Sequence, residues 1–177
     1  MLNWIVNLFK KKEKVEMLDM PEMLNRLIIH EGLVLKPYIC PAGKLTIGIG
    51  RNVEDNPLTV EERRVVGDDW KHGITKEQAY YLCRNDINKC ISELKKNLPW
   101  FENLDRERKY ALIDMCFQLG IRGLLKFKRT LGSIAKGNYE LAAEQVLESK
   151  YARVDSPERA KRISILIKTG RWERWVK

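Results

Sequence analysis

A change of hydrophobic period at Gly32 constrains the fold of this chain more than any other feature of its sequence. Before Gly32, apolar residues recur at the spacing of one helix face, at positions 20, 23, 24, 27 and 28. This pattern predicts a helix over 21–30. Pro21 suits the first turn of a helix, and Gly32 suits the position just past its end. Glu31 is therefore expected at the helix C-terminus, where the helix dipole disfavours an anion, so this carboxylate is poorly placed to serve stability.

The residues that follow this helix predict an antiparallel hairpin. Residues 34–39 and 44–48 have strand-like patterns and flank the turn Pro41-Ala42-Gly43. Cys40 follows the first strand directly, and Thr46 lies on the second. An acid, a thiol and a hydroxyl thus come from three adjacent elements that can face one cavity.

The spacing of Glu31, Cys40 and Thr46 within E-G-L-x-L-K-x-Y…G-x-x-T-I-G-I-G resembles that of the T-even-type phage lysozymes, the endolysins of glycoside hydrolase family 24. Members of that family carry Glu, Asp or Cys, and Thr at these positions. The pattern is specific because it fixes three chemical side chains together with several glycines. The resemblance leaves residues 1–19 outside and continues to the end of the chain, through segments 73–76, 117–120, 157–162 and 169–172.

Further helices follow from cap residues and apolar periodicity. Thr59 with Glu62, and Thr75 with Gln78, have the spacing of capping boxes and predict two helix starts. The first helix is expected to be short, and the second to extend to about Lys96. Helical patterns also cover 105–119, 124–135, 139–148 and 157–168.

The resemblance implies an α+β, mostly helical, two-lobed lysozyme fold. Its N-terminal lobe carries a small antiparallel sheet, its C-terminal lobe is a helical bundle, and a long helix joins the two. The domain limits are 1–19 for an amphipathic basic extension and 20–177 for the lysozyme domain. Within that domain we expect the sheet-containing lobe at 20–74, the linking helix at 75–98 and the helical lobe at 99–177.

The resemblance assigns catalytic roles to Glu31, Cys40 and Thr46. Cleaving a glycosidic bond requires a proton for the leaving oxygen and help for a water or nucleophile at the sugar. A carboxylic acid supplies that proton near neutral pH only where burial or an unfavourable field disfavours its ionised form. Glu31, at a helix end before an apolar hairpin, has such a setting and by resemblance is the general acid. By resemblance the Thr46 hydroxyl holds the catalytic water, and ordinary packing of a β-branched residue is the alternative.

Cys40 departs from the Asp that is commoner at its position. A thiolate can act as a base towards water or as a nucleophile if its pKa falls towards the working pH, and nearby Lys36 and Lys44 favour such a fall. The course stays open between inversion through activated water and retention through a thioglycosyl intermediate. If Cys40 only fills space, Glu54 or Asp55 would supply the second carboxylate.

Three further residues match positions that the family uses around the sugar cleft. Gln118 and Phe127 are candidates for substrate binding, and for each of them a core or surface role is the alternative. Arg159 is expected to pair with the catalytic acid across the cleft, and its alternative is a solvated basic helix. Another pairing implied by the resemblance joins Arg51 to Asp86, and we interpret it as structural.

Composition narrows the class of protein. A hydrophobic content of 44% excludes a disordered chain. The net charge of +9 favours a polyanionic partner, which can be nucleic acid, an acidic membrane surface or an acidic glycan. The four cysteines fit no metal-binding spacing and indicate reduced thiols made in a cytosol. Cys83, Cys90 and Cys116 are expected to be buried or half-buried small hydrophobes.

The function expected from the resemblance is that of an endolysin. Such a protein is an N-acetylmuramidase, which hydrolyses the β-1,4 bond between N-acetylmuramic acid and N-acetylglucosamine in peptidoglycan and causes host lysis. No cofactor or metal is implied, and a monomer is expected. One alternative is a catalytically impaired wall- or membrane-binding module. The other is a basic nucleic-acid-binding protein, which the composition permits but no recognisable motif supports.

The first residues of the chain have an amphipathic pattern. Residues 2–9 place their apolar side chains on one broad helix face, and Lys10-Lys11-Lys12 follow. The apolar run is too short to span a bilayer and lacks the charge order of a signal peptide. Two interpretations of residues 2–12 stay open, packing on the chain's own domain and docking on anionic lipid or lipopolysaccharide. We expect synthesis in a host cytoplasm, with release to the periplasm and cell wall at lysis through a separate membrane pore.

Overall fold

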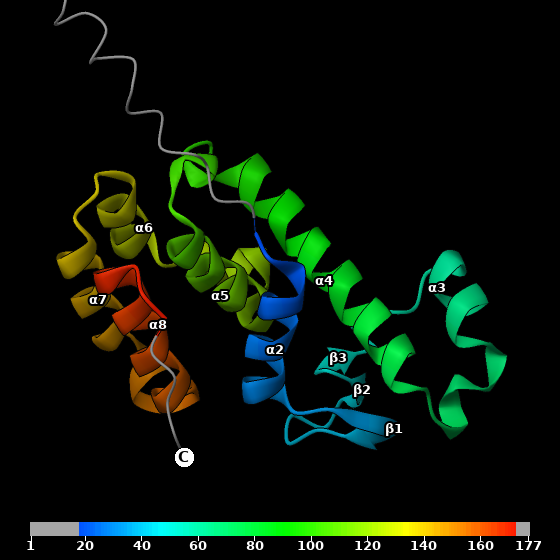
Figure 1. The fold of residues 1–177 in the computed structure, drawn as a ribbon. Coiled ribbons are helices and arrows are strands. Elements are labelled where there is room, and N and C mark those ends of the chain that lie inside the picture. The colour runs from blue at the N-terminus through cyan, green and yellow to red at the C-terminus, as the bar shows by residue number, and fades with distance from the viewer. Residues whose placement is uncertain (1–17, 173–177) are drawn as a thin grey trace, which may run out of the picture. The chain divides into compact units, whose positions relative to one another are not determined.

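The computed structural model describes residues 18–172 as helices with one small antiparallel sheet near the start of that range (Figure 1). This confirms the predicted α+β, mostly helical lysozyme fold. The helices are α2 (Met20–Glu31), α3 (Val60–Val66), α4 (Lys76–Asn97), α5 (Arg106–Leu124), α6 (Lys128–Ala135), α7 (Tyr139–Leu147) and α8 (Pro157–Thr169). The strands are β1 (Val34–Ile39), β2 (Leu45–Gly48) and β3 (Arg51–Asn52).

The amphipathic segment predicted at residues 2–12 lies outside the described residues, so both interpretations of it stay predictions. Among the helices of residues 18–172, none combines the length and the apolar character that crossing a membrane requires.

The described residues divide into two compact units. Residues 19–97 and 113–127 form a sheet-containing unit, which holds α2, α3, α4 and the second part of α5. Residues 98–112 and 128–172 belong to a helical unit, which holds α6, α7 and α8. The finer domain limits predicted from the sequence stay predictions.

The predicted helix before Gly32 is α2, one residue longer at each end. Asp19 caps its first turn, because the Asp19 carboxylate accepts a hydrogen bond of 3.0 Å from the backbone N–H of Glu22. Gly32 ends the helix with φ 74°, which a residue without Cβ adopts without strain. Met23 and Leu27 bury the inner face of α2, so Glu31 is held at the end of an anchored helix.

Both predicted capping boxes are present. Thr59 and Glu62 exchange side-chain and backbone hydrogen bonds of 3.1 and 2.9 Å at the start of α3. Thr75 and Gln78 do the same at 3.2 and 2.8 Å before α4. Each box satisfies two backbone N–H groups that the first turn of a helix leaves without partners.

One helix limit predicted from the sequence is wrong. The helix predicted over 105–119 does end at Gly120, whose φ of 66° and ψ of 163° are not helical, and a second helical segment within α5 continues to Leu124. The next helix, α6, starts only at Lys128 instead of 124, because residues 126 and 127 form short turn bonds back to Gly123 and Leu124. Glycine can take the positive φ at residue 120 without the Cβ clash that other residues meet, so the predicted helix ends there. The sequence also missed three short helical turns at 68–72, 101–103 and 151–155.

The Arg51 guanidinium is the centre of a buried polar network in the sheet-containing unit. It donates to both carboxylate oxygens of Glu62 at 3.1 and 2.8 Å and to Asp86 at 2.9 Å, which confirms the predicted Arg51–Asp86 pair. It also donates to the backbone carbonyls of Asn56 and Pro57 at 3.0 and 3.3 Å. These bonds join β3 to the loop after it, to α3 and to α4.

The two carboxylates of this network respond differently to their surroundings. Burial raises the pKa of Asp86 above its ordinary value in spite of Arg51. Burial also opposes ionisation of Glu62, but hydrogen bonds from Arg51, from the Thr59 backbone and from Asn85 outweigh it and hold the pKa of Glu62 below its ordinary value. Glu62 is thus the better stabilised anion, and both depend on the single guanidinium.

Replacing Arg51 by Met is expected to lower the free energy of unfolding by about 3–5 kcal/mol, because it leaves two buried carboxylates without their cation. Urea denaturation followed by circular dichroism measures this change. The matched control is Lys44→Met, since Lys44 faces the carboxylates of Glu54 and Asp55 at 3.6 and 3.3 Å but is 40% exposed. This control should leave the free energy of unfolding nearly unchanged, and equal losses in both variants would contradict the special role of the buried network.

Candidate active site

Glu31 lies at the end of α2 against the backbone of Gly50. Gly50 directly precedes β3 and has φ 69°. A Cβ atom at this position would lie 2.7 Å from Oε2 of Glu31 and 3.0 Å from its carboxyl carbon. A side chain at this position would displace the carboxylate, so the Glu31 carboxyl group lies against the backbone of Gly50 because Gly50 has no Cβ.

Cys40 follows β1 and is half-buried beside the turn that leads into β2. Its backbone N–H donates to the carbonyl of Lys44 at 2.9 Å, and its own carbonyl accepts from Gly43 at 2.8 Å. Hydrogen bonds to the sulfur from the Lys44 backbone, and next from the Thr46 side chain, lower the pKa of the Cys40 thiol below its ordinary value against a smaller effect of burial. The fall that the sequence attributed to lysine charges thus comes mainly from the turn itself.

Thr46 is buried on β2, with 3% of its surface exposed. Its hydroxyl donates to the Lys44 carbonyl at 3.1 Å and also lies within hydrogen-bonding reach of the Cys40 sulfur. A hydroxyl has one proton to donate. When Cys40 ionises, that proton can turn from the carbonyl to the thiolate, so Thr46 is placed to respond to the charge on Cys40.

Tyr38 is a residue of this site that the sequence reasoning missed. It lies on β1 directly opposite Thr46. Burial, and next the negative charges of Cys40 and Glu31, raise the pKa of Tyr38 above its ordinary value, so its phenol lies within electrostatic range of both groups. Its position carried the signal, because Tyr38 lies near the end of β1, two residues before Cys40.

The structure therefore brings Glu31, Cys40 and Thr46 together around Tyr38 in one unit. Gln118 and Phe127 belong to the same unit and are half-buried, on α5 and just before α6. Arg159 belongs to the helical unit, on the first turn of α8. It is 8% exposed, which does not fit the alternative of a solvated basic face. The roles of these three residues at the sugar stay predictions.

The carboxylates considered as substitutes for Cys40 have structural partners. Glu54 accepts a hydrogen bond of 2.9 Å from the backbone of Leu45, and Asp55 accepts one of 2.8 Å from Asn52. Both also face Lys44. These contacts hold Glu54 and Asp55 at the exposed turn after β3, so Cys40 is the better-placed partner for Glu31.

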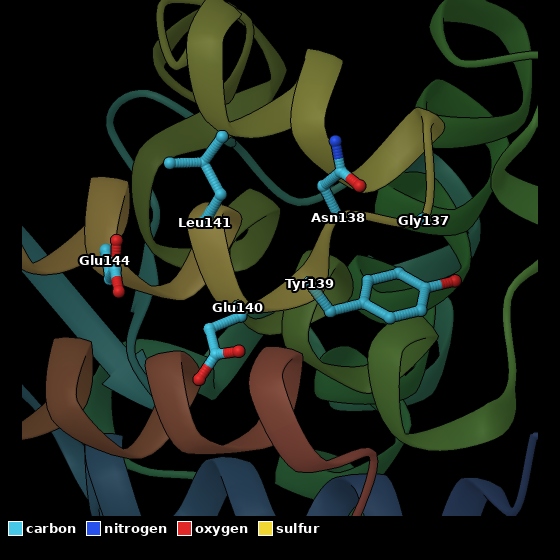
Figure 2. Close-up of a pocket in the computed structure, with 6 residues that line it drawn as sticks. All are labelled: Gly137, Asn138, Tyr139, Glu140, Leu141 and Glu144. Atoms are coloured by element: carbon cyan, nitrogen blue, oxygen red, sulfur yellow. The ribbon is translucent and has the colours of Figure 1, made fainter.

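A surface hollow in the helical unit is formed by residues 137–141 and Glu144 (Figure 2). Its Glu140 is paired with Lys168 at 2.6 Å, and its Tyr139 stacks on the Arg108 guanidinium with 3.6 Å from the guanidinium carbon to the ring centroid. The hollow contains none of the predicted catalytic residues, and no cysteine, serine or histidine lines it. We therefore assign the candidate site to the sheet-containing unit, where the Glu31 carboxyl group and the Cys40 thiol lie within electrostatic range of the same side chain, Tyr38.

Comparison with known families decides the identity of this arrangement. The family model described as Phage lysozyme matches residues 29–167, a range that includes every site residue predicted above. The chain belongs to the phage lysozyme family. Membership of this family supports the assignment of the chain as a lysozyme-like glycoside hydrolase.

Curated relatives of this phage lysozyme family member differ in length. The chain is 30% identical over 170 residues to the pre-baseplate central spike protein Gp5 of Enterobacteria phage T4, which covers 88% of this chain but only 28% of that protein. It is 31% identical over 153 residues to a probable T4-type lysozyme 1 of Dictyostelium discoideum, which covers 79% of this chain and 89% of that protein. The similarity thus covers most of the length of the Dictyostelium protein but less than a third of the spike protein of phage T4.

The reactivity of Cys40 tests the geometry of this site independently of catalysis. The Thr46 hydroxyl stabilises the thiolate of Cys40. We therefore expect Thr46→Val to raise the pH at which alkylation of Cys40 by iodoacetamide reaches half its maximal rate. Thr46→Ser retains the hydroxyl and should keep the wild-type value. Mass spectrometry of the labelled peptides separates Cys40 from Cys83, whose pKa burial raises and which should react slowly. An unchanged profile in Thr46→Val would contradict the hydrogen bond.

Proposed function

We propose that this protein is an endolysin, an N-acetylmuramidase that hydrolyses the β-1,4 bond between N-acetylmuramic acid and N-acetylglucosamine in peptidoglycan. The observation that carries the proposal is that the Glu31 carboxyl group and the Cys40 thiol, whose ionisation is favoured, both lie within electrostatic range of Tyr38. Family membership gives the class of reaction, and the pairing of an acid with an anion is what glycoside hydrolysis requires.

In the proposed reaction Glu31 is the general acid. Its proton passes to the glycosidic oxygen while the bond from that oxygen to the anomeric carbon breaks. Positive charge develops on the sugar ring, and the Cys40 thiolate lies in the same site to stabilise it. Gly50 supports this step, because its missing side chain lets the carboxyl group lie against the sheet.

The incoming water is the second reactant. We propose that Cys40 accepts a proton from this water while the Thr46 hydroxyl orients it, and that the water oxygen bonds to the anomeric carbon on the face opposite the leaving group. The product is then the inverted anomer, and Glu31 is left as a carboxylate that recovers the proton held by Cys40 through solvent. The position of Thr46 beside the sulfur supports this course over direct attack by sulfur, since two neighbouring groups can hold one water.

The remaining residues serve recognition in this proposal. Gln118, Phe127 and Arg159 contact the glycan, and the net charge of +9 suits an anionic cell wall. The protein acts as a monomer, is made in a host cytoplasm and reaches the wall at lysis. These assignments follow the family resemblance.

The direct test is turbidity loss of Gram-negative cells stripped of their outer membrane, with wild type beside Glu31→Gln. Wild type should clear the suspension and release fragments with new reducing muramic acid ends, identified by mass spectrometry. Glu31→Gln keeps the shape of the side chain but cannot donate the proton, so its rate should fall by a factor of about 100 or more. Equal clearing by both proteins would move the chemistry away from Glu31. Clearing by neither would favour a wall-binding module without activity.

The role of Cys40 is tested by comparing Cys40→Ala with Cys40→Asp. The Ala variant lacks a base and should lose activity by a factor of about 100 or more, whereas the Asp variant restores an anion and should retain a measurable rate. Proton NMR of the first product formed on a soluble glycan assigns its anomer. Full activity of Cys40→Ala would remove the cysteine from the mechanism, and a retained anomer in the wild type would replace activated water with a thioglycosyl intermediate.

A further inference from the structure

The side chain of His30 is buried in the last turn of α2, directly before Glu31. It is 6% exposed, whereas the neighbouring Ile29 is 51% exposed. The residue after the turn, Gly32, has no side chain to pack and changes the chain direction with φ 74°. The position of the last turn therefore depends on side chains within it, and the buried side chain of His30 is one of them.

His30 meets the carboxylate of Asp114, which lies on α5. The distance from Nε2 of His30 to Oδ2 of Asp114 is 3.6 Å, and the Asp114 side chain is 9% exposed. A buried carboxylate requires a charged or hydrogen-bonding partner. His30 is the side chain of α2 that the structure places at this distance from Asp114.

Asp114 connects this contact to a second part of the site. Asp114 and Gln118 are four residues apart on α5 and therefore lie on one face of that helix. His30 and Glu31 are adjacent on α2. The contact thus links the helix end that carries the candidate acid to the helix face that carries a candidate sugar-binding residue.

We propose that the His30–Asp114 contact is a positioning pair that fixes Glu31 relative to Gln118. This inference rests on the muramidase function proposed above. Neither His30 nor Asp114 touches the sugar in this proposal. Their effect on the reaction comes from holding α2 against α5, so that the proton of Glu31 is delivered at the right distance from a sugar bound by Gln118.

The test is a double-mutant cycle with kcat and KM measured on solubilised, dye-labelled peptidoglycan. Asp114→Asn and His30→Gln keep the size of each side chain nearly unchanged and remove the charge pairing. Each should lower kcat by about tenfold to a hundredfold with a smaller change in KM, because small displacements of a catalytic group have effects of this size. The double variant should be no slower than the slower single variant, since both changes break one contact.

The matched control is Asp19→Ala, which removes the cap at the other end of the same helix. It should lower the thermal midpoint, yet keep the wild-type kcat well below that midpoint. Wild-type kcat in Asp114→Asn, additive losses in the double variant, or an equal loss in Asp19→Ala would overturn the positioning role while leaving the muramidase intact. A wild type that does not cleave peptidoglycan would refute the proposed function, and the positioning role would fall with it.

Discussion

The buried guanidinium of Arg51 is the interaction on which the sheet-containing unit depends. Its five hydrogen bonds go to side chains on α3 and α4 and to two backbone carbonyls of the loop after β3. A charge in this position requires partners on all sides, because desolvation of an unpaired ion is costly. The segments around Arg51 are therefore fixed together, and Gly50, its neighbour in the chain, is fixed with them.

That arrangement explains how a very small sheet can carry a chemical site. β3 has two residues and β2 has four, which is too little sheet for independent stability. The Arg51 network and the core residue Ile47, which is fully buried, hold these strands against α3 and α4. Glu31 then lies against the backbone of Gly50, which this packing holds in place. The hydrogen bonds of the turn between β1 and β2 hold Cys40 and Thr46.

Local sequence signals predicted much of this arrangement. The apolar spacing before Gly32 predicted α2, strand alternation and a turn predicted β1 and β2, and two capping boxes placed the starts of α3 and α4. Signals of this kind act between residues close in the chain, where geometry follows from the residue types themselves. They failed at the start of α6, which apolar periodicity placed at 124, because the turn bonds of residues 126 and 127 delay the helix to Lys128.

What the sequence determined by itself is the order of the elements and the chemical types at the site. An acid at a helix end, a thiol after a strand and a hydroxyl on the next strand follow from periodicity, turn residues and caps. The tertiary structure decided which groups meet. The contact of Glu31 with Gly50 and the pairing of His30 with Asp114 each join segments that are apart in the chain. Their physical basis is burial, which forces polar groups to find partners wherever the fold supplies them.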